Sequence, residues 1–220
     1  MNTVATFTPI DLETWPRTPY YEYYRNTLKT KYTVSIKIDI TNIIAIYKDQ
    51  GYKFFPTFLY VIMKALNNSE ELRTSIHNGQ LGTWNYLTPQ FTLFHEDDKT
   101  FSDLWSDYSE DFRVFYQNII TDIEKYKDVK GIKIKAGLPA NFTPISCVPW
   151  ISFDSISQDT SHDSDFLKPI IRFGKYYTEH EKVLIPLSVY VNHAIADGYH
   201  TSMFLQDIQN IVNDAKNWIK

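Results

Sequence analysis

Cysteine is nearly absent from this sequence, and so are long apolar segments. Cys147 is the only cysteine among 220 residues, so no internal disulfide can form. No uninterrupted apolar run approaches the roughly 18 residues that a membrane-spanning helix needs. The N-terminus, MNTVATFTPIDLETW, has neither the basic start nor the apolar stretch of a secretory signal. We therefore expect a cytoplasmic protein without a membrane partner.

An excess of basic residues is also missing. The chain has 22 Lys and Arg against 26 Asp and Glu, which gives a formal net charge of −4. Binding to nucleic acid by counterion release needs a clustered basic face, and the sequence contains no such cluster. Neither nucleic acid nor an anionic membrane surface is therefore expected as a partner.

No linker rich in Gly, Ser or Pro divides the chain, and no segment repeats at a fixed period. A chain of this size, with 43% hydrophobic residues, buries about 70% of its unfolded surface and needs no metal or disulfide to hold a core. The sequence therefore predicts a single domain over residues 1–220.

Strand and helix patterns are mixed along the chain without strict alternation. Apolar alternation predicts strands at 33–40, 90–96, 141–150, 169–177 and 182–193. Helical spacing predicts helices at 17–28, 41–51, 56–66, 109–126 and 204–212, and Asn78-Gly79 predicts a hairpin turn. These elements predict an α/β fold, a two-layer sandwich in which helices cover a mixed β-sheet.

The segment VYVNHAIADGYH, residues 189–200, ends an apolar strand in a histidine. His193 shares the parity of the apolar residues before it, and Asp197 and His200 follow closely. A strand that ends in His and returns through Asp-Gly into a helix brings imidazole and carboxylate together at a sheet edge. Because the unperturbed pKa of histidine is about 6.5, His193 is suited to act as a general base near neutral pH.

Two other chemistries fit this segment less well. His193, Asp197 and His200 could bind a metal only from one continuous helix, which Gly198 and the preceding strand pattern disfavour, so no metal is expected. A nucleophilic serine is not indicated, because no G-x-S-x-G occurs. Taken alone, His193 also fits a buried histidine with a purely structural role.

HAIADGYH resembles the H-x-x-x-D-G-x-H signature of the chloramphenicol acetyltransferase family. Similar segments follow in that family's order along nearly the whole chain: IDLETWPR, YKFFPTFLY, ELRTSI, PQFTLFHEDDKTFS, DIEKYK, PISCVPWISFDS, PIIRFGKY and IPLSVYVNHAIADGYH. The shorter H-x-x-x-D-G is shared with dihydrolipoyl acyltransferase cores and peptide-synthetase condensation domains. The resemblance implies a chloramphenicol-acetyltransferase-like fold and direct transfer of acetyl from acetyl-CoA to an acceptor hydroxyl, without an acetyl-enzyme.

The resemblance also implies roles for individual residues. His193 matches the base that takes the proton of the acceptor hydroxyl, and Ser146 matches the serine that donates a hydrogen bond to the oxyanion. Asp197 matches an aspartate that pairs with an arginine, here Arg17, and so holds the loop that carries the histidine. The predicted acceptor pocket includes Tyr24, Thr92 and Phe101, and the predicted coenzyme side includes Lys53, Trp150, Lys175 and Tyr176. The family works as a homotrimer, in which one chain supplies the base and its neighbour supplies much of the acceptor pocket.

Three predicted pocket positions depart from the family pattern. Arg172 stands where the family typically has a threonine that holds a water, Asp103 replaces a small residue, and Gln158 replaces an apolar one. Polar groups at apolar contact points lose hydrogen bonds when an aromatic acceptor binds, unless Arg172 and Asp103 pair with each other.

We therefore expect an acetyl-CoA-dependent O-acetyltransferase that inactivates chloramphenicol. Two alternatives remain: the same chemistry on a different hydroxyl compound, and a relative that binds its ligand without turnover.

Overall fold

The computed structural model describes residues 4–158 and 165–219 of the chain. The strands are β1 Phe7–Pro9, β2 Lys31–Asp39, β3 Thr74–His77, β4 Gln80–Trp84, β5 Thr88–His95, β6 Thr100–Trp105, β7 Phe142–Val148, β8 Ile170–Gly174, β9 Tyr177–Glu179 and β10 Lys182–Asn192. The α-helices are α1 Thr18–Glu22, α2 Thr41–Tyr47, α3 Phe54–Asn68, α4 Phe112–Tyr126, α5 Gly198–Asn213 and α6 Ala215–Trp218. A π-helical segment, Tyr23–Thr27, follows α1, and a 3₁₀ turn, Glu71–Arg73, precedes β3.

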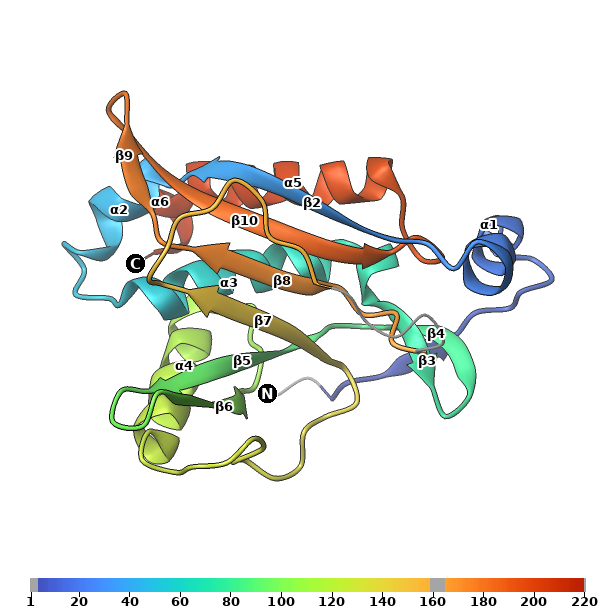
Figure 1. Cartoon of the computed structure of the whole chain (residues 1–220), viewed down its shortest axis with the longest axis horizontal. Helices are drawn as coiled ribbons and strands as arrows, with labels where there is room; N and C mark the ends of the chain where they lie inside the picture. Colours follow the sequence, from blue (N-terminus) through green and yellow to red (C-terminus); the bar gives the residue numbers. More distant parts are fainter. Residues whose placement is uncertain (1–3, 159–164, 220) are drawn as a thin grey trace.

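The larger sheet has the order β2-β10-β8-β7-β5-β6, and β9 pairs with β10. The pairs β8/β7 and β7/β5 are parallel, and β2/β10, β10/β8 and β5/β6 are antiparallel, so the sheet is mixed. A smaller antiparallel sheet has the order β1-β4-β3. Figure 1 shows α3 and α5 together on one side of the larger sheet. The predicted mixed α/β sandwich is therefore confirmed.

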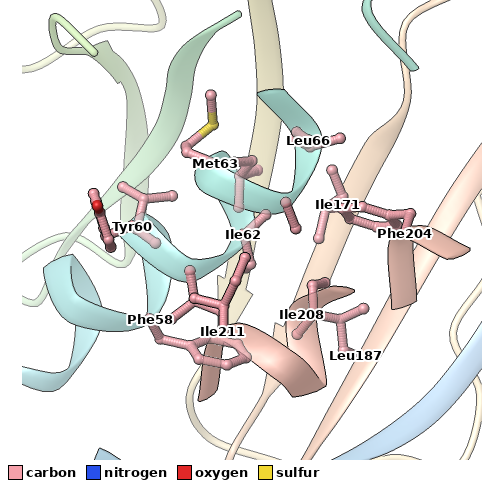
Figure 2. Packing of buried hydrophobic residues seen from close by; sticks show 14 of the residues in the cluster. Phe58, Tyr60, Ile62, Met63, Leu66, Ile171, Leu187, Phe204, Ile208 and Ile211 are labelled. Atoms are coloured by element: carbon pink, nitrogen blue, oxygen red, sulfur yellow. The ribbon is translucent and has the colours of Figure 1, made fainter. Parts of the chain in front are cut away.

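The core lies between the larger sheet and these two helices. Figure 2 shows Phe58 and Ile62 of α3 in one cluster with Ile208 of α5, Ile171 of β8 and Leu187 of β10. All five side chains are at most 1% exposed. Because side chains alternate along a strand, the residues between these apolar positions point to the opposite side of the sheet, which we call the outer face. Thr92, Ser146, Arg172 and Ser188 belong to this outer face.

Most predicted elements are confirmed in type, with shifted ends. Helix α3 begins two residues before Pro56, whose missing N–H costs nothing in a first turn. At the β3–β4 hairpin, Asn78 and Gly79 both have positive φ, as the predicted tight turn requires. The predicted strand 169–177 divides into β8 and β9, because Lys175 leaves the ladder and donates its backbone N–H to the Ile151 carbonyl. Within the described residues, no helix has both the length and the apolar composition to cross a membrane.

Candidate active site

Strand β10 delivers His193 to the end of the larger sheet. The strand is buried over most of its length, and the backbone N–H of His193 still donates to the Thr30 carbonyl at 3.0 Å. The chain then turns, with the side chain of Asn192 accepting a hydrogen bond from the Ala194 N–H at 3.0 Å. It enters α5 at Asp197, whose carboxylate accepts from the Tyr199 N–H and caps the helix. This strand, turn and capped helix hold both ends of the histidine loop.

Two tyrosine rings fix the imidazole of His193. The Tyr24 ring stacks on it with centroids 3.7 Å apart and an interplanar angle of 14°. The Tyr32 ring meets it edge-on at 5.3 Å, and the Tyr32 hydroxyl lies 2.7 Å from the Thr201 hydroxyl on α5. The Nδ1 atom of His193 is buried and has no hydrogen-bond partner among residues 4–158 and 165–219. The Nε2 atom is therefore the ring nitrogen left for contact with a reactant.

A chain of charged groups anchors the loop behind His193. The Arg17 Nη1 donates to Asp197 Oδ2 at 3.0 Å, and the His200 Nδ1 lies 2.8 Å from Asp197 Oδ1. On its far side, His200 Nε2 lies 3.4 Å from a carboxylate oxygen of Glu71. Burial alone would raise the pKa of Asp197, but Arg17 and His200 outweigh it and hold that pKa at about 2. Asp197 is therefore a carboxylate at any ordinary pH.

Ser146 belongs to a different region of the chain, in a largely apolar cavity of about 520 Å³. Its Oγ lies 3.5 Å from the Oγ1 of Thr92 on the neighbouring strand β5. The apolar lining includes Phe55, Phe91, Phe94, Phe101 and Trp150. Cys147 also lines this cavity, and burial raises the pKa of its thiol to about 12, which keeps it protonated and unreactive. The cavity therefore offers two adjacent hydroxyl groups, those of Ser146 and Thr92, in apolar surroundings.

His193 and Ser146 do not meet within one chain. Ser146 pairs with Arg172 on β8, which pairs with Ser188 on β10, so Ser146 lies two strands from β10. His193 lies five positions farther along β10 than Ser188. With about 3.4 Å per residue and 4.8 Å per strand, the two Cα atoms are roughly 20 Å apart. An imidazole and a hydroxymethyl group together span about 7 Å from their Cα atoms, so at least roughly 13 Å remains between Nε2 and Oγ.

The other predicted acceptor residues divide between these two regions. Tyr24 stacks on His193, whereas Thr92 and Phe101 line the cavity with Ser146. Gln158 is exposed and does not line that cavity. It lies on the loop after β7, which approaches the outer face where the Ile156 carbonyl accepts from the Ser188 hydroxyl at 2.8 Å.

The hypothesis that Asp103 pairs with Arg172 is wrong. Asp103 lies opposite Thr92 on the edge strand β6, three strands from Arg172, or roughly 14 Å between Cα atoms. It lines a separate cavity of about 150 Å³ together with Gln90 and Lys133. Burial raises the pKa of Asp103, and the charge of Lys133 and a hydrogen bond from Gln90 partly offset this shift.

The predicted coenzyme residues gather near the carboxyl ends of β7 and β8. Trp150 lines the Ser146 cavity and packs edge-on against Phe94 at 4.7 Å. Tyr176 packs against the ring of Phe54 at 5.1 Å, next to Lys53, which precedes α3. The side chains of Lys53 and Lys175 are exposed. Of the predicted coenzyme residues, Trp150 lines the Ser146 cavity, and Lys53, Lys175 and Tyr176 are not among its lining residues.

Sequence reasoning missed three residues near His193. Tyr32, Glu71 and His200 all contact the histidine loop or its anchors. The last histidine of H-x-x-x-D-G-x-H was a usable signal, because position N3 of a helix faces its N-cap residue. Tyr32 and Glu71 carried no such signal. The metal interpretation of His193, Asp197 and His200 gains no support, because His193 precedes α5 and no cluster of metal-binding side chains occurs among the described residues.

Comparison with known proteins gives one family. The model of the family described as chloramphenicol acetyltransferase matches residues 5–209. A chloramphenicol acetyltransferase of Clostridium perfringens is 38% identical over 97% of this chain and 98% of its own. Chloramphenicol acetyltransferase 3 of Escherichia coli is 37% identical over 94% of this chain and 97% of its own.

Solved structures agree on the fold. One chloramphenicol acetyltransferase structure, 20% identical, superposes with a TM-score of 0.83 over 94% of this chain and 100% of its own. The cubic core of a pyruvate dehydrogenase multienzyme complex, 16% identical, superposes with a TM-score of 0.65 over 92% of this chain and 88% of its own.

Proposed function

The chain belongs to the chloramphenicol acetyltransferase family of acyltransferases, and we propose that it transfers acetyl from acetyl-CoA to a hydroxyl of chloramphenicol. The observation that carries this proposal is the pair of preorganised half-sites. One contains an imidazole held between two tyrosines and anchored through Arg17 and Asp197. The other contains the hydroxyl of Ser146, beside that of Thr92, in a largely apolar cavity.

The proposed reaction needs both halves. Nε2 of His193 removes the proton of the acceptor hydroxyl as its oxygen attacks the thioester carbonyl. The Ser146 hydroxyl donates a hydrogen bond to the oxyanion that forms, a contribution of about 3 kcal/mol in comparable sites. The C–S bond then breaks, and the imidazolium returns its proton to the departing thiolate. The acetyl ester and free CoA are the products, and no acetyl-enzyme forms.

A homotrimer is part of the proposal because of the distance within one chain. A gap of at least roughly 13 Å between Nε2 and Oγ is far beyond the 2.6–3.2 Å at which a base acts. A neighbouring copy removes this gap if its His193 approaches the outer face near Ser146. The sites then lie between chains, and the acetyl-CoA thioester reaches them through the Ser146 cavity, past Lys53, Trp150, Lys175 and Tyr176.

The test is release of free thiol from acetyl-CoA in the presence of chloramphenicol. We expect turnover by the wild type, and a loss of about 10³-fold in kcat for His193→Ala with little change in the KM for acetyl-CoA. Lys216→Ala is a matched control, because Lys216 is exposed on α6 and lies outside both half-sites. Retention of a tenth of wild-type kcat by His193→Ala would exclude His193 as the base. Absence of thiol release in the wild type would favour a protein that binds without turnover.

A further inference from the structure

Arg172 lies directly beside Ser146 on the outer face of the sheet. The two residues are Cα partners in the parallel pair β7/β8, and on its other side Arg172 pairs with Ser188 of β10. Neighbouring Cα atoms across a sheet are about 4.8 Å apart, so the long side chain of Arg172 can reach an acceptor whose reacting oxygen lies next to the oxyanion bound at Ser146. Arg172 is therefore a direct cross-strand neighbour of Ser146 on the outer face, although it does not itself line the Ser146 cavity.

The guanidinium of Arg172 is half-buried and has no hydrogen-bond or ion-pair partner within residues 4–158 and 165–219. Other half-buried arginines in the same chain differ in this respect. Arg17 binds Asp197, Arg25 forms an ion pair with Asp165, and Arg73 donates to the Trp84 carbonyl. Burial lowers the pKa of Arg172, and no acidic side chain offsets this shift. A half-buried guanidinium that has lost part of its hydration and has no counter-charge in the chain is suited to receive an anion supplied from outside.

The bound acceptor is the source of anion that fits this place. The diphosphate of acetyl-CoA is excluded, because the pantetheine arm holds it roughly 15 Å from the thioester. Asp103 is excluded by its position three strands away, beside Lys133. A carboxylate on the acceptor would receive two parallel hydrogen bonds from the planar guanidinium, which is the geometry that arginine favours.

We propose that Arg172 makes this enzyme selective for a hydroxyl compound that carries a carboxylate a few bonds from the reacting hydroxyl, and that chloramphenicol is the poorer acceptor. This inference rests on the proposed acetyl transfer and concerns the acceptor only. An uncharged acceptor leaves Arg172 unpaired at the site, whereas a hydroxy acid neutralises it. The same contact fixes the orientation of the acceptor, since two parallel hydrogen bonds define a plane.

The experiment compares hydroxymethylbenzoate with its methyl ester, in the meta and para isomers, by thiol release from acetyl-CoA. We expect the wild type to prefer the acid in at least one isomer. Arg172→Gln should lower the acid-to-ester ratio of kcat/KM about tenfold to hundredfold, because one charged, bidentate contact is lost. Arg172→Lys, the matched control that keeps the charge and loses the fork, should give an intermediate ratio. The KM for chloramphenicol should fall in Arg172→Gln, a change opposite in sign to that for the acid.

The possible results of this experiment separate the inference about the acceptor from the acetyltransferase proposal. Thiol release with chloramphenicol but no preference for the acid in the wild type would overturn the inference and leave the acetyltransferase proposal intact. An acid preference that survives unchanged in Arg172→Gln would overturn it as well. Absence of thiol release with every acceptor would instead contradict the acetyltransferase proposal. Inhibition of the wild-type enzyme tests the same inference without a variant. Benzoate should compete with the acceptor at a lower concentration than benzamide. Equal inhibition by the two compounds would count against a carboxylate site.

Discussion

Two inactive variants should restore activity when their chains assemble together. His193→Ala lacks the base and Ser146→Ala lacks the oxyanion donor, and each homotrimer should be nearly inactive. In a mixed trimer, one interface joins the intact His193 of a Ser146→Ala chain to the intact Ser146 of a His193→Ala chain. The expectation follows from the roughly 20 Å that separate the two Cα atoms in one chain.

The expected size of the effect follows from the arrangement of a ring. A cyclic trimer that contains both variants has three interfaces. Only one of them joins an intact His193 to an intact Ser146, whichever variant is present twice. Mixed trimers should therefore show about one third of wild-type kcat. The residual activity of Ser146→Ala alone should be about 10²- to 10³-fold below the wild type. The gain on mixing is therefore large against this background.

The assay needs co-expression of the two variants with different affinity tags, purification over both tags, and thiol release with saturating acetyl-CoA and acceptor. The control is His193→Ala carrying both tags in the same way, which should stay inactive. If the mixed trimers were no more active than Ser146→Ala alone, the shared site would be refuted. A particle of about 26 kDa that is fully active would refute it independently.

Further expectations concern the anchors and the coenzyme side. Arg17→Ala and Asp197→Asn should each lower kcat and thermal stability. The double variant should lose little more kcat and stability than either single variant, because both changes remove the same 3.0 Å contact. Additive losses of stability in the double variant would contradict the pairing. The pKa of Asp197 is about 2, so the stability that the Arg17–Asp197 pair contributes should be complete above about pH 5 and disappear as the pH falls towards 2. Acid unfolding of the wild type and of Arg17→Ala, compared over this pH range, measures that contribution. In Gly174→Ala the new methyl group would lie 2.8 Å from the Ile151 carbonyl oxygen, which accepts a hydrogen bond from the Lys175 N–H. The backbone must shift at Lys175, a predicted coenzyme residue, so the KM for acetyl-CoA should rise. An unchanged KM with unchanged stability would show that the backbone adapts freely.

Much of the fold and part of the site could be predicted from local sequence. Alternation of apolar residues predicted β2, β5, β7 and β10, because a strand buried on one face must repeat every second residue. The histidine after β10 and the Asp-Gly that begins α5 were likewise local signals, and the resemblance to the family was confirmed. The edge strand β6 was missed, since its residues Thr100–Trp105 do not alternate cleanly between apolar and polar side chains.

Local sequence determined which groups are present, and the tertiary structure decided which of them meet. Local patterns in the chain do not reveal that Arg172 is the Cα partner of Ser146, because the register of β7 against β8 joins residues that lie far apart in the sequence. The same register puts Asp103 three strands away beside Lys133, and it separates Ser146 from His193. Side-chain periodicity is a property of a few neighbouring residues, whereas the distance between two strands depends on the whole sheet. The chemical identity of the site residues could therefore be predicted from the sequence, and a site divided between chains was expected from the family resemblance. Only the folded chain gives the separation of Ser146 from His193 along and across the sheet.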